Sequence, residues 1–430
     1  MGHQKLGKNR TNPLNDTRFI VLLIAAALSA ILFMIPDASR YTVLETSTRR
    51  YVRCKVISVE ETDTQETSKY SGMTVGTQTV TVEIDGKTVE IVNNLSDTHH
   101  IEVKPGSRVV VCVDEPDNTE PYYTIANYDR TGVEIGILAF FALILILTGG
   151  MRGVYALAAL AFSVIFLFKV TIPAIYSGQP VLTVTAAAVI IITPVSICLI
   201  SGVNKKSAVS AAAVFVGEAA AAVIFSIFSA VLHISGFVDE NVDGLLLVTY
   251  ATGMDLSHLL FAAAMISSLG AVMDVAVSLV AALFEIHDKN PLLGRRELFA
   301  SGMNVGRDMM GTMSNTLIFA FFGSALSMLL VLYSYGVQTL ALLTSDFIAV
   351  ELAHGICGTA AVILTVPLSA LLSSLALTRG KQPSLSKSGG KQVPQAVSPE
   401  KQTPHGDEKQ VPHGDEKQVP VSISPEKQSL

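Results

Sequence analysis

The sequence predicts an α-helical integral membrane protein with about eight transmembrane helices and a small extracytoplasmic all-β domain. Half of the 430 residues are hydrophobic and only 15% are charged, and the charges gather in a few segments that leave long apolar runs between them. A bilayer core of about 30 Å needs about 20 apolar residues per helix, so these runs are candidate spans. The β domain is predicted from alternating, valine-rich strand patterns between the first two runs.

The first apolar run follows basic residues, as in a signal peptide. However, Pro36 and Asp37 occupy the positions where a small-residue cleavage site would lie, so we expect an uncleaved anchor. The second run is short for a span. In chain order the eight candidate spans are 19–35, 133–148, 154–175, 181–200, 208–232, 259–284, 312–333 and 348–377.

Charged residues in the loops predict the orientation in the membrane. Arg18, Arg152, Lys205 and Arg295 flank spans on one side, whereas the acidic 239–243 loop lies on the other. The positive-inside rule therefore places both termini in the cytoplasm. The predicted organisation is a cytoplasmic N-terminus (1–18), an anchor (19–36), an extracytoplasmic β-rich domain (40–130), a seven-helix membrane domain (131–378) and a disordered cytoplasmic tail (379–430).

The β-rich segment contains two strand-like runs joined through Asp85 and Gly86, which together predict a hairpin. Five short strands are expected, forming a small barrel or sandwich. This domain is either a passive spacer or lid, or a gate or binding module. A disulfide between Cys54 and Cys112 stays open, because both lie in this outer segment.

A carboxylate stands within the apolar run "MISSLGAVMDVAVSLVAALF", residues 265–284. Asp274 lies near the centre of its span, where a carboxylate costs about 2.5 to 3.5 kcal/mol. We therefore expect its side chain to face the interior of the helix bundle. Ser267, Gly270 and Ser278 share its helical face, which predicts a packing surface, a solute path or both.

Other polar residues interrupt the later spans. Glu218 lies within the fifth span beside Gly217. Segment 285–311 is predicted to be either a moving element with glycine hinges or an interfacial helix. The remaining candidates for a pathway are Arg307, Asp308, Thr312, Asn315, Glu351 and His354.

Two stretches carry a family resemblance. "GAVMDVAVSLVAALFEIHDKNP" and "ELFASGMNVGRDMMGTMSNTLIFAFFGSAL" resemble the signature of the YibE/F family of bacterial membrane proteins. The similarity covers residues 19–377, and 270–324 is its specific part. It implies an N-terminal anchor, an outer β-rich segment and a seven-helix region, and it supplies no mechanism.

The leading hypothesis is a transporter or permease for an ion or small polar solute, with Asp274 as its central carboxylate. Buried ionisable groups mark such pathways in membrane helices, and Arg307 would pair with a carboxylate or an anionic solute. The alternative is a non-transporting scaffold whose outer β domain binds envelope partners. No cofactor, metal or nucleic-acid pattern is found, and the H-E-x-x-H, G-x-S-x-G and P-loop motifs of enzymes are absent from the sequence. The expected partner is the lipid bilayer, and homo-oligomerisation stays open.

Overall fold

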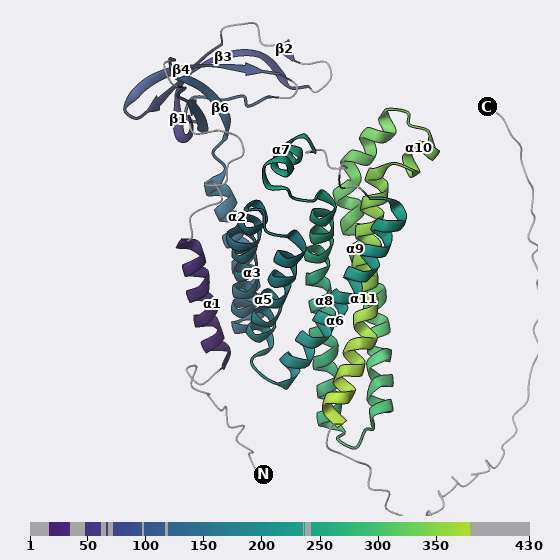
Figure 1. Ribbon diagram of the computed structural model, residues 1–430. Coiled ribbons are helices and arrows are strands. Elements are labelled where there is room, and N and C mark those ends of the chain that lie inside the picture. The colour runs from purple at the N-terminus through teal and green to yellow at the C-terminus, as the bar shows by residue number, and fades with distance from the viewer. Residues whose placement is uncertain are drawn as a thin grey trace, which may run out of the picture. The chain divides into compact units, whose positions relative to one another are not determined.

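The structure is a computed structural model, and it describes residues 17–34, 48–61, 66–67, 72–96, 99–116, 119–234, 236 and 242–378 (Figure 1). The predicted disordered tail, 379–430, and nearly all of the predicted N-terminal segment, 1–18, lie outside the described residues. The described part consists of a β domain and a set of long helices.

The β domain is one sheet curved into a half-barrel, with six strands where five were expected. Asp85 and Gly86 both have positive φ, 53° and 75°, and they join two strands in register from Ile84 and Lys87, which confirms the predicted hairpin. The strands are β1 (Arg49–Glu61), β2 (Glu66–Thr67), β3 (Thr74–Ile84), β4 (Lys87–Leu95), β5 (Arg108–Asp114) and β6 (Tyr122–Tyr128), in the order β2-β3-β1-β5-β6 with β4 paired to β3.

The two cysteines of this domain are free. Cys54 is buried in the valine-rich core, whereas Cys112 is paired in register with the exposed Tyr51 on the neighbouring strand. Side chains alternate between the faces of a sheet, so the two thiols point to opposite faces. A disulfide between Cys54 and Cys112 is therefore not part of this fold.

Eight helical stretches are long and apolar enough to cross a membrane, among the described residues, and each overlaps one of the predicted spans. One of them, Met151–Tyr176, is a composite of α3, a π-helical turn and α4. The helical elements are α1 (Thr17–Met34), α2 (Thr131–Gly149), α3 (Met151–Phe166), the π-helix η3 (Leu167–Thr171), α4 (Ile172–Tyr176), α5 (Val181–Ser201), α6 (Lys205–Leu232), α7 (Val242–Thr252), α8 (Leu256–Lys289), α9 (Arg295–Ser334), α10 (Thr339–Leu343) and α11 (Asp346–Thr378).

The predicted moving segment, 285–311, differs most from its expectation. Helix α8 continues to Lys289, and after a short turn α9 begins at Arg295, where Glu297 Oε2 accepts a hydrogen bond of 2.8 Å from Gly294 N–H. The two expected hinge glycines, Gly302 and Gly306, are buried against α11. The segment is therefore mostly helical, and its glycines allow α9 to pack closely on α11.

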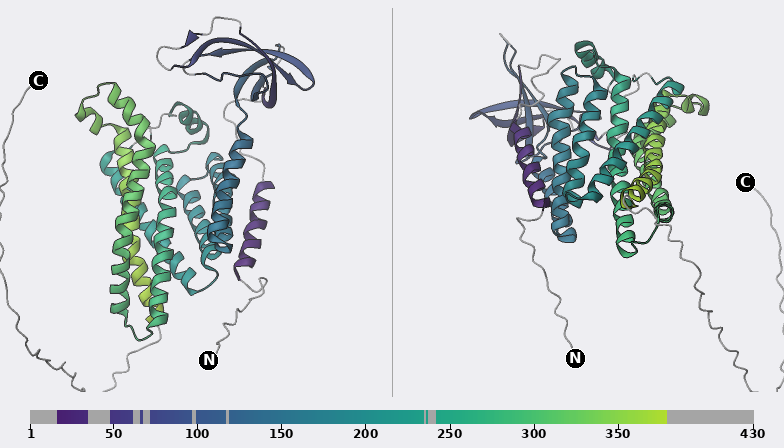
Figure 2. Two further views of the ribbon diagram at one scale, coloured as in Figure 1. Left: turned by 180° about the vertical axis from the view of Figure 1, so that it is seen from behind. Right: turned by 60° about the horizontal axis from the view of Figure 1, so that its bottom comes forward.

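The helices form two groups that meet through α5 (Figures 1 and 2). In the first group, α6, α8 and α11 pack on one another and α9 packs along α11. In the second, α1 and α3 pack with α5, and α2 packs on α3 without burying any residue. The first group is the one that buries an acidic residue, Glu218.

One end of the first group carries four basic residues, Lys205, Lys206, Arg295 and Arg296, and is called the basic end below. The ammonium group of Lys206 at the start of α6 lies 5.7 Å from the ring centroid of Phe284 near the end of α8. Early in α9, a Cβ on Gly302 would lie 2.8 Å from the Cβ of Ala370 near the end of α11. Helices α6 and α9 therefore begin at the end of the group where α8 and α11 finish.

Candidate functional site

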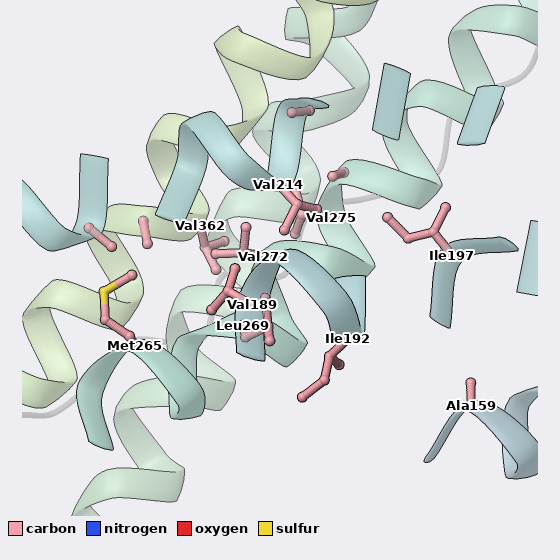
Figure 3. Packing of buried hydrophobic residues seen from close by; sticks show 14 of the residues in the cluster. Ala159, Val189, Ile192, Ile197, Val214, Met265, Leu269, Val272, Val275 and Val362 are labelled. Atoms are coloured by element: carbon pink, nitrogen blue, oxygen red, sulfur yellow. The ribbon is translucent and has the colours of Figure 1, made fainter. Parts of the chain in front are cut away.

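The core of the first group is a closely packed seam between α6, α8 and α11. Valine and leucine side chains from several helices interlock there, among them Val214, Val272 and Val362 (Figure 3). Gly217 marks the closest approach, because a Cβ added to it would lie 2.3 Å from Thr365 Oγ1 and 3.2 Å from Val272 Cγ1. Only a residue without a side chain fits between these helices.

Glu218, the next residue on α6, points into this seam. Glu218 is only 3% exposed, and it is the only buried acidic or basic residue among those the structure describes. Ser268 on α8, 1% exposed, lies with its Oγ at 3.4 and 3.5 Å from the two carboxylate oxygens. A carboxyl group is thus held inside the bundle by a hydroxyl.

The Ser268 hydroxyl has one hydrogen and two acceptors within reach. Its Oγ lies 3.1 Å from Met265 O of its own helix as well as near the carboxylate of Glu218. An ionised Glu218 accepts the hydrogen bond from Ser268, whereas a protonated Glu218 donates to Ser268 while Ser268 donates to Met265 O. The pair can therefore satisfy both protonation states of the carboxyl group.

Hydroxyl groups continue from this pair toward the basic end along one face of α11. Thr365, Ser369 and Ser373 follow one another at intervals of four residues, and all three are fully buried. Thr365 donates to Ala361 O at 2.7 Å, but Ser369 and Ser373 have no hydrogen-bond partner among the described residues. Two polar side chains thus lie in the interior without a protein partner.

Aromatic residues occupy the other side of Glu218. Phe225 lies two helical turns further along the same face of α6, is 2% exposed, and meets Phe261 edge to face with ring centroids 5.6 Å apart. The His354 ring stacks on Phe225 at 5.7 Å, and its Nε2 lies 3.2 Å from Leu260 O. Since a carbonyl oxygen only accepts, Nε2 carries the hydrogen in this contact. The interior is apolar and closed on this side.

Asp274 does not point into the bundle, so the expected interior position is wrong. Asp274, Ser267, Gly270 and Ser278 are all exposed, while Val272 on the opposite face of α8 is fully buried. The apolar face of the helix takes the core because it packs with α6 and α11, which leaves the small and polar face outside. Among the exposed large hydrophobic residues of the described chain, none comes from α8.

The other predicted pathway residues do not join Glu218. Asp308, Thr312 and Asn315 lie on an exposed face of α9, where Arg307 Nη1 donates to Asn304 Oδ1 at 3.4 Å. Glu351, half-buried, lines an apolar cavity of about 460 Å³ between α9, α10 and α11. Of the predicted residues, the structure brings only Glu218 and His354 to the α6–α8–α11 seam.

Several residues of this site were not predicted from the sequence: Ser268, Thr365, Ser369, Ser373 and Phe225. Ser267 and Ser268 are adjacent, but only Ser267 lies on the polar face that contains Asp274, and the sequence prediction included that face alone. The repeated four-residue spacing of Thr365, Ser369 and Ser373 was a signal in the sequence for a hydroxyl-bearing face.

The long apolar helices and the polar interior define an α-helical membrane protein. Residues 137–379, more than half of the chain, match the family model described as YibE/F-like protein, and the chain belongs to this family. The match covers the whole first group of helices and confirms the resemblance carried by 270–324. No curated protein and no solved structure matches the chain.

Proposed function

We propose that this protein is a permease for an ion or small polar solute in the bacterial cell membrane, and that Glu218 is its central carboxylate. The observation that carries the proposal is the burial of Glu218 in the α6–α8–α11 seam with the hydroxyl of Ser268 as its partner. The proposed role thus moves from Asp274 to the acid that lies within the bundle.

The burial of Glu218 is not needed for packing. An apolar side chain of similar size would fill the same volume without the cost of removing a carboxyl group from water. Acidic residues inside membrane helices are rare and usually mark an ion or proton path for this reason. The hydroxyl of Ser268 can hydrogen-bond to either protonation state of Glu218. This supports a carboxyl group that gains and loses a proton during transport.

The orientation is part of the proposal. We place the basic end, with Lys205, Lys206, Arg295 and Arg296, in the cytoplasm, because the positive-inside rule favours it. Both termini are then cytoplasmic and the β domain is extracytoplasmic. The polar residues of α9 remain predicted pathway residues in this proposal, whereas Asp274 on the exposed face of α8 does not.

The test is a current measurement on the purified protein in liposomes. Solid-supported membranes record transient currents under imposed gradients of protons, sodium, potassium and phosphate. We expect a current in the wild type that is lost in Glu218→Gln, a substitution close in shape that cannot ionise. Asp274→Asn is the matched control on the exposed face, and we expect it to retain the larger part of the current.

Three outcomes would contradict the proposal. A folded Glu218→Gln protein that still carries the full current removes Glu218 from the mechanism, and loss of current in Asp274→Asn alone returns the central role to Asp274. If the wild type carries no current under any gradient, the scaffold function replaces transport, and partners of the β domain become the next target.

A further inference from the structure

The two sides of Glu218 differ in chemistry, and the difference runs along the bundle. Toward the basic end the interior carries the hydroxyls of Thr365, Ser369 and Ser373. Toward the opposite end it carries Phe225 and an apolar cluster. In this conformation the unpartnered buried hydroxyls of Ser369 and Ser373 therefore lie between Glu218 and the basic end, whereas Phe225 lies on the other side.

Ser369 and Ser373 are the observation that points to water. A serine in a membrane helix normally donates to a backbone carbonyl three or four residues earlier, as Ser374 does to Leu371 O at 2.8 Å. Ser369 and Ser373 are fully buried, and their hydroxyl groups lack such a bond among the described residues. An unpartnered buried hydroxyl costs about 1 to 3 kcal/mol, which water would offset.

Small side chains lie opposite these hydroxyls. Helices α6 and α11 run antiparallel, because α6 begins at the basic end and α11 finishes there. One turn from the contact between Gly217 and Thr365, the pairing brings Ser369 to the level of Ala213. The next turn brings Ser373 to the level of Ser210, which is buried on the same face of α6.

The composition of the site favours a proton over a metal cation. The described residues contain no group of three or more His, Cys, Asp or Glu side chains that could hold a metal ion. Near Glu218, Asp274 is on the outer face of α8, and His354 lies beyond Phe225 with its Nε2 at Leu260 O. The thiol of Cys357 on α11 is buried in the cluster that contains Phe225. Glu218 is thus a single carboxyl group reached through hydroxyls.

We propose that protons reach Glu218 from the basic end through water molecules held by Ser369 and Ser373, and that Phe225 closes the path on the other side. The inference rests on the proposed function and names the proton as the species that Glu218 binds. A hydronium ion in the water file donates its proton to a carboxylate oxygen of Glu218 and becomes water, and the hydroxyl hydrogen of Ser268 then turns from Glu218 to Met265 O. The reverse movements return the proton to the water file.

Thiol labelling tests the path without any transport measurement. In a variant whose four cysteines are replaced by alanine, Ser369→Cys and Ser373→Cys are each treated with a small membrane-impermeant thiosulfonate from one side of the membrane at a time. We expect both to react only from the side of the basic end, and about tenfold faster than Val366→Cys, since the reaction needs a thiolate in contact with water. Val366 is a matched control because it is fully buried at similar depth but packs on Gly306.

The closure at Phe225 is tested in the Ser369→Cys variant. Adding Phe225→Ala should allow labelling from the opposite side as well, whereas Phe228→Ala, at the edge of the same cluster, should leave that side unreactive. Ser369→Cys that is as unreactive as Val366→Cys from both sides, in a protein that remains folded, would overturn the proposal. So would labelling from the opposite side while Phe225 is present.

A second readout addresses the proton itself. Infrared difference spectra after a pH change should contain a protonated-carboxyl band that is lost in Glu218→Gln. In the double variant Ser369→Ala and Ser373→Ala we expect this band to form about tenfold more slowly, because water is no longer held along the path. An unchanged rate would refute the path, and it would leave the role of Glu218 in transport to be judged by the current measurement alone.

Discussion

The two opposite faces of α8 lie next to two different acidic side chains, Glu218 of α6 and Asp274 of α8 itself. On the inner face, Ser268 contacts the buried carboxyl of Glu218 from α6. On the outer face, Asp274 lies exposed among Ser267, Gly270 and Ser278. Both acids stand near the middle of a long apolar helix, so position along the helix does not distinguish them. The difference teaches that the partner helices decide which acid is enclosed.

The largest expected change in stability distinguishes a glycine inside the seam, Gly217, from a glycine on the outer face of α8, Gly270. Gly217→Val should destabilise the protein by about 3 kcal/mol, because the new side chain would overlap Thr365 and Val272. Gly270→Val, which introduces the same side chain where no heavy atom lies within 4 Å, should leave the stability nearly unchanged. Thermal unfolding of both variants in the same detergent measures the difference. Equal destabilisation would mean that the outer face of α8 is also packed.

A second pair of glycines on α9 separates packing from hinge motion. Gly306→Ala should cost about 2 kcal/mol, since a Cβ there would lie 2.1 Å from Val366 Cγ1. Gly311→Ala, with open space around it, should be neutral or stabilise the helix by up to about 1 kcal/mol. Unfolding midpoints report these changes. A Gly306→Ala protein of unchanged stability but slowed transport would instead restore the hinge interpretation.

Adjacent serines provide a finer test of the two faces of α8. Ser268→Ala should destabilise the protein by about 1 to 2 kcal/mol, because the buried carboxyl of Glu218 loses its hydroxyl partner. Ser267→Ala removes an exposed hydroxyl that bonds only within its own helix, to Ala264 O, and should change the stability by less than about 0.5 kcal/mol. Denaturation curves in mild detergent are sufficient for this comparison. If Ser267→Ala proved the more harmful, the assignment of inner and outer face would be reversed.

The smallest expected change in stability concerns Asp255, the exposed N-cap residue of α8. The backbone N–H and the hydroxyl of Ser257 bond to Asp255, and this holds the pKa of Asp255 below its usual range. The carboxylate therefore stabilises the fold at neutral pH, and this contribution is lost as the pH falls through the lowered pKa, below about 4. Asp255→Ala should cost about 0.5 to 1 kcal/mol at pH 7, because the helix loses its N-cap.

A matched substitution isolates the charge of Asp255. Asp255→Asn keeps a capping oxygen but cannot titrate, so its stability should follow that of the wild type at pH 7 and depend less on pH in the acid range. The unfolding midpoint measured between pH 3 and 7 decides between them. A wild-type curve as flat as that of Asp255→Asn would show that Asp255 does not contribute through its charge.

The sequence by itself determined the elements of this protein. Runs of about 20 apolar residues favour membrane-length helices, since a helix satisfies its own backbone hydrogen bonds in lipid. In the same way, Asp85 and Gly86 specify a hairpin because both adopt the left-handed conformation that its turn requires. These features depend on a few neighbouring residues, and a sequence contains them in full.

Only the tertiary structure decided which polar residues meet. Glu218, Ser268 and Thr365 come from three helices far apart in the chain, and their meeting depends on how the helices rotate when their apolar faces pack. On α8 both faces are compatible with an interior position when the helix is considered alone, one by its valines and the other by its small and polar residues. Packing with α6 and α11 buries the valine face, and Asp274 is left outside for that reason.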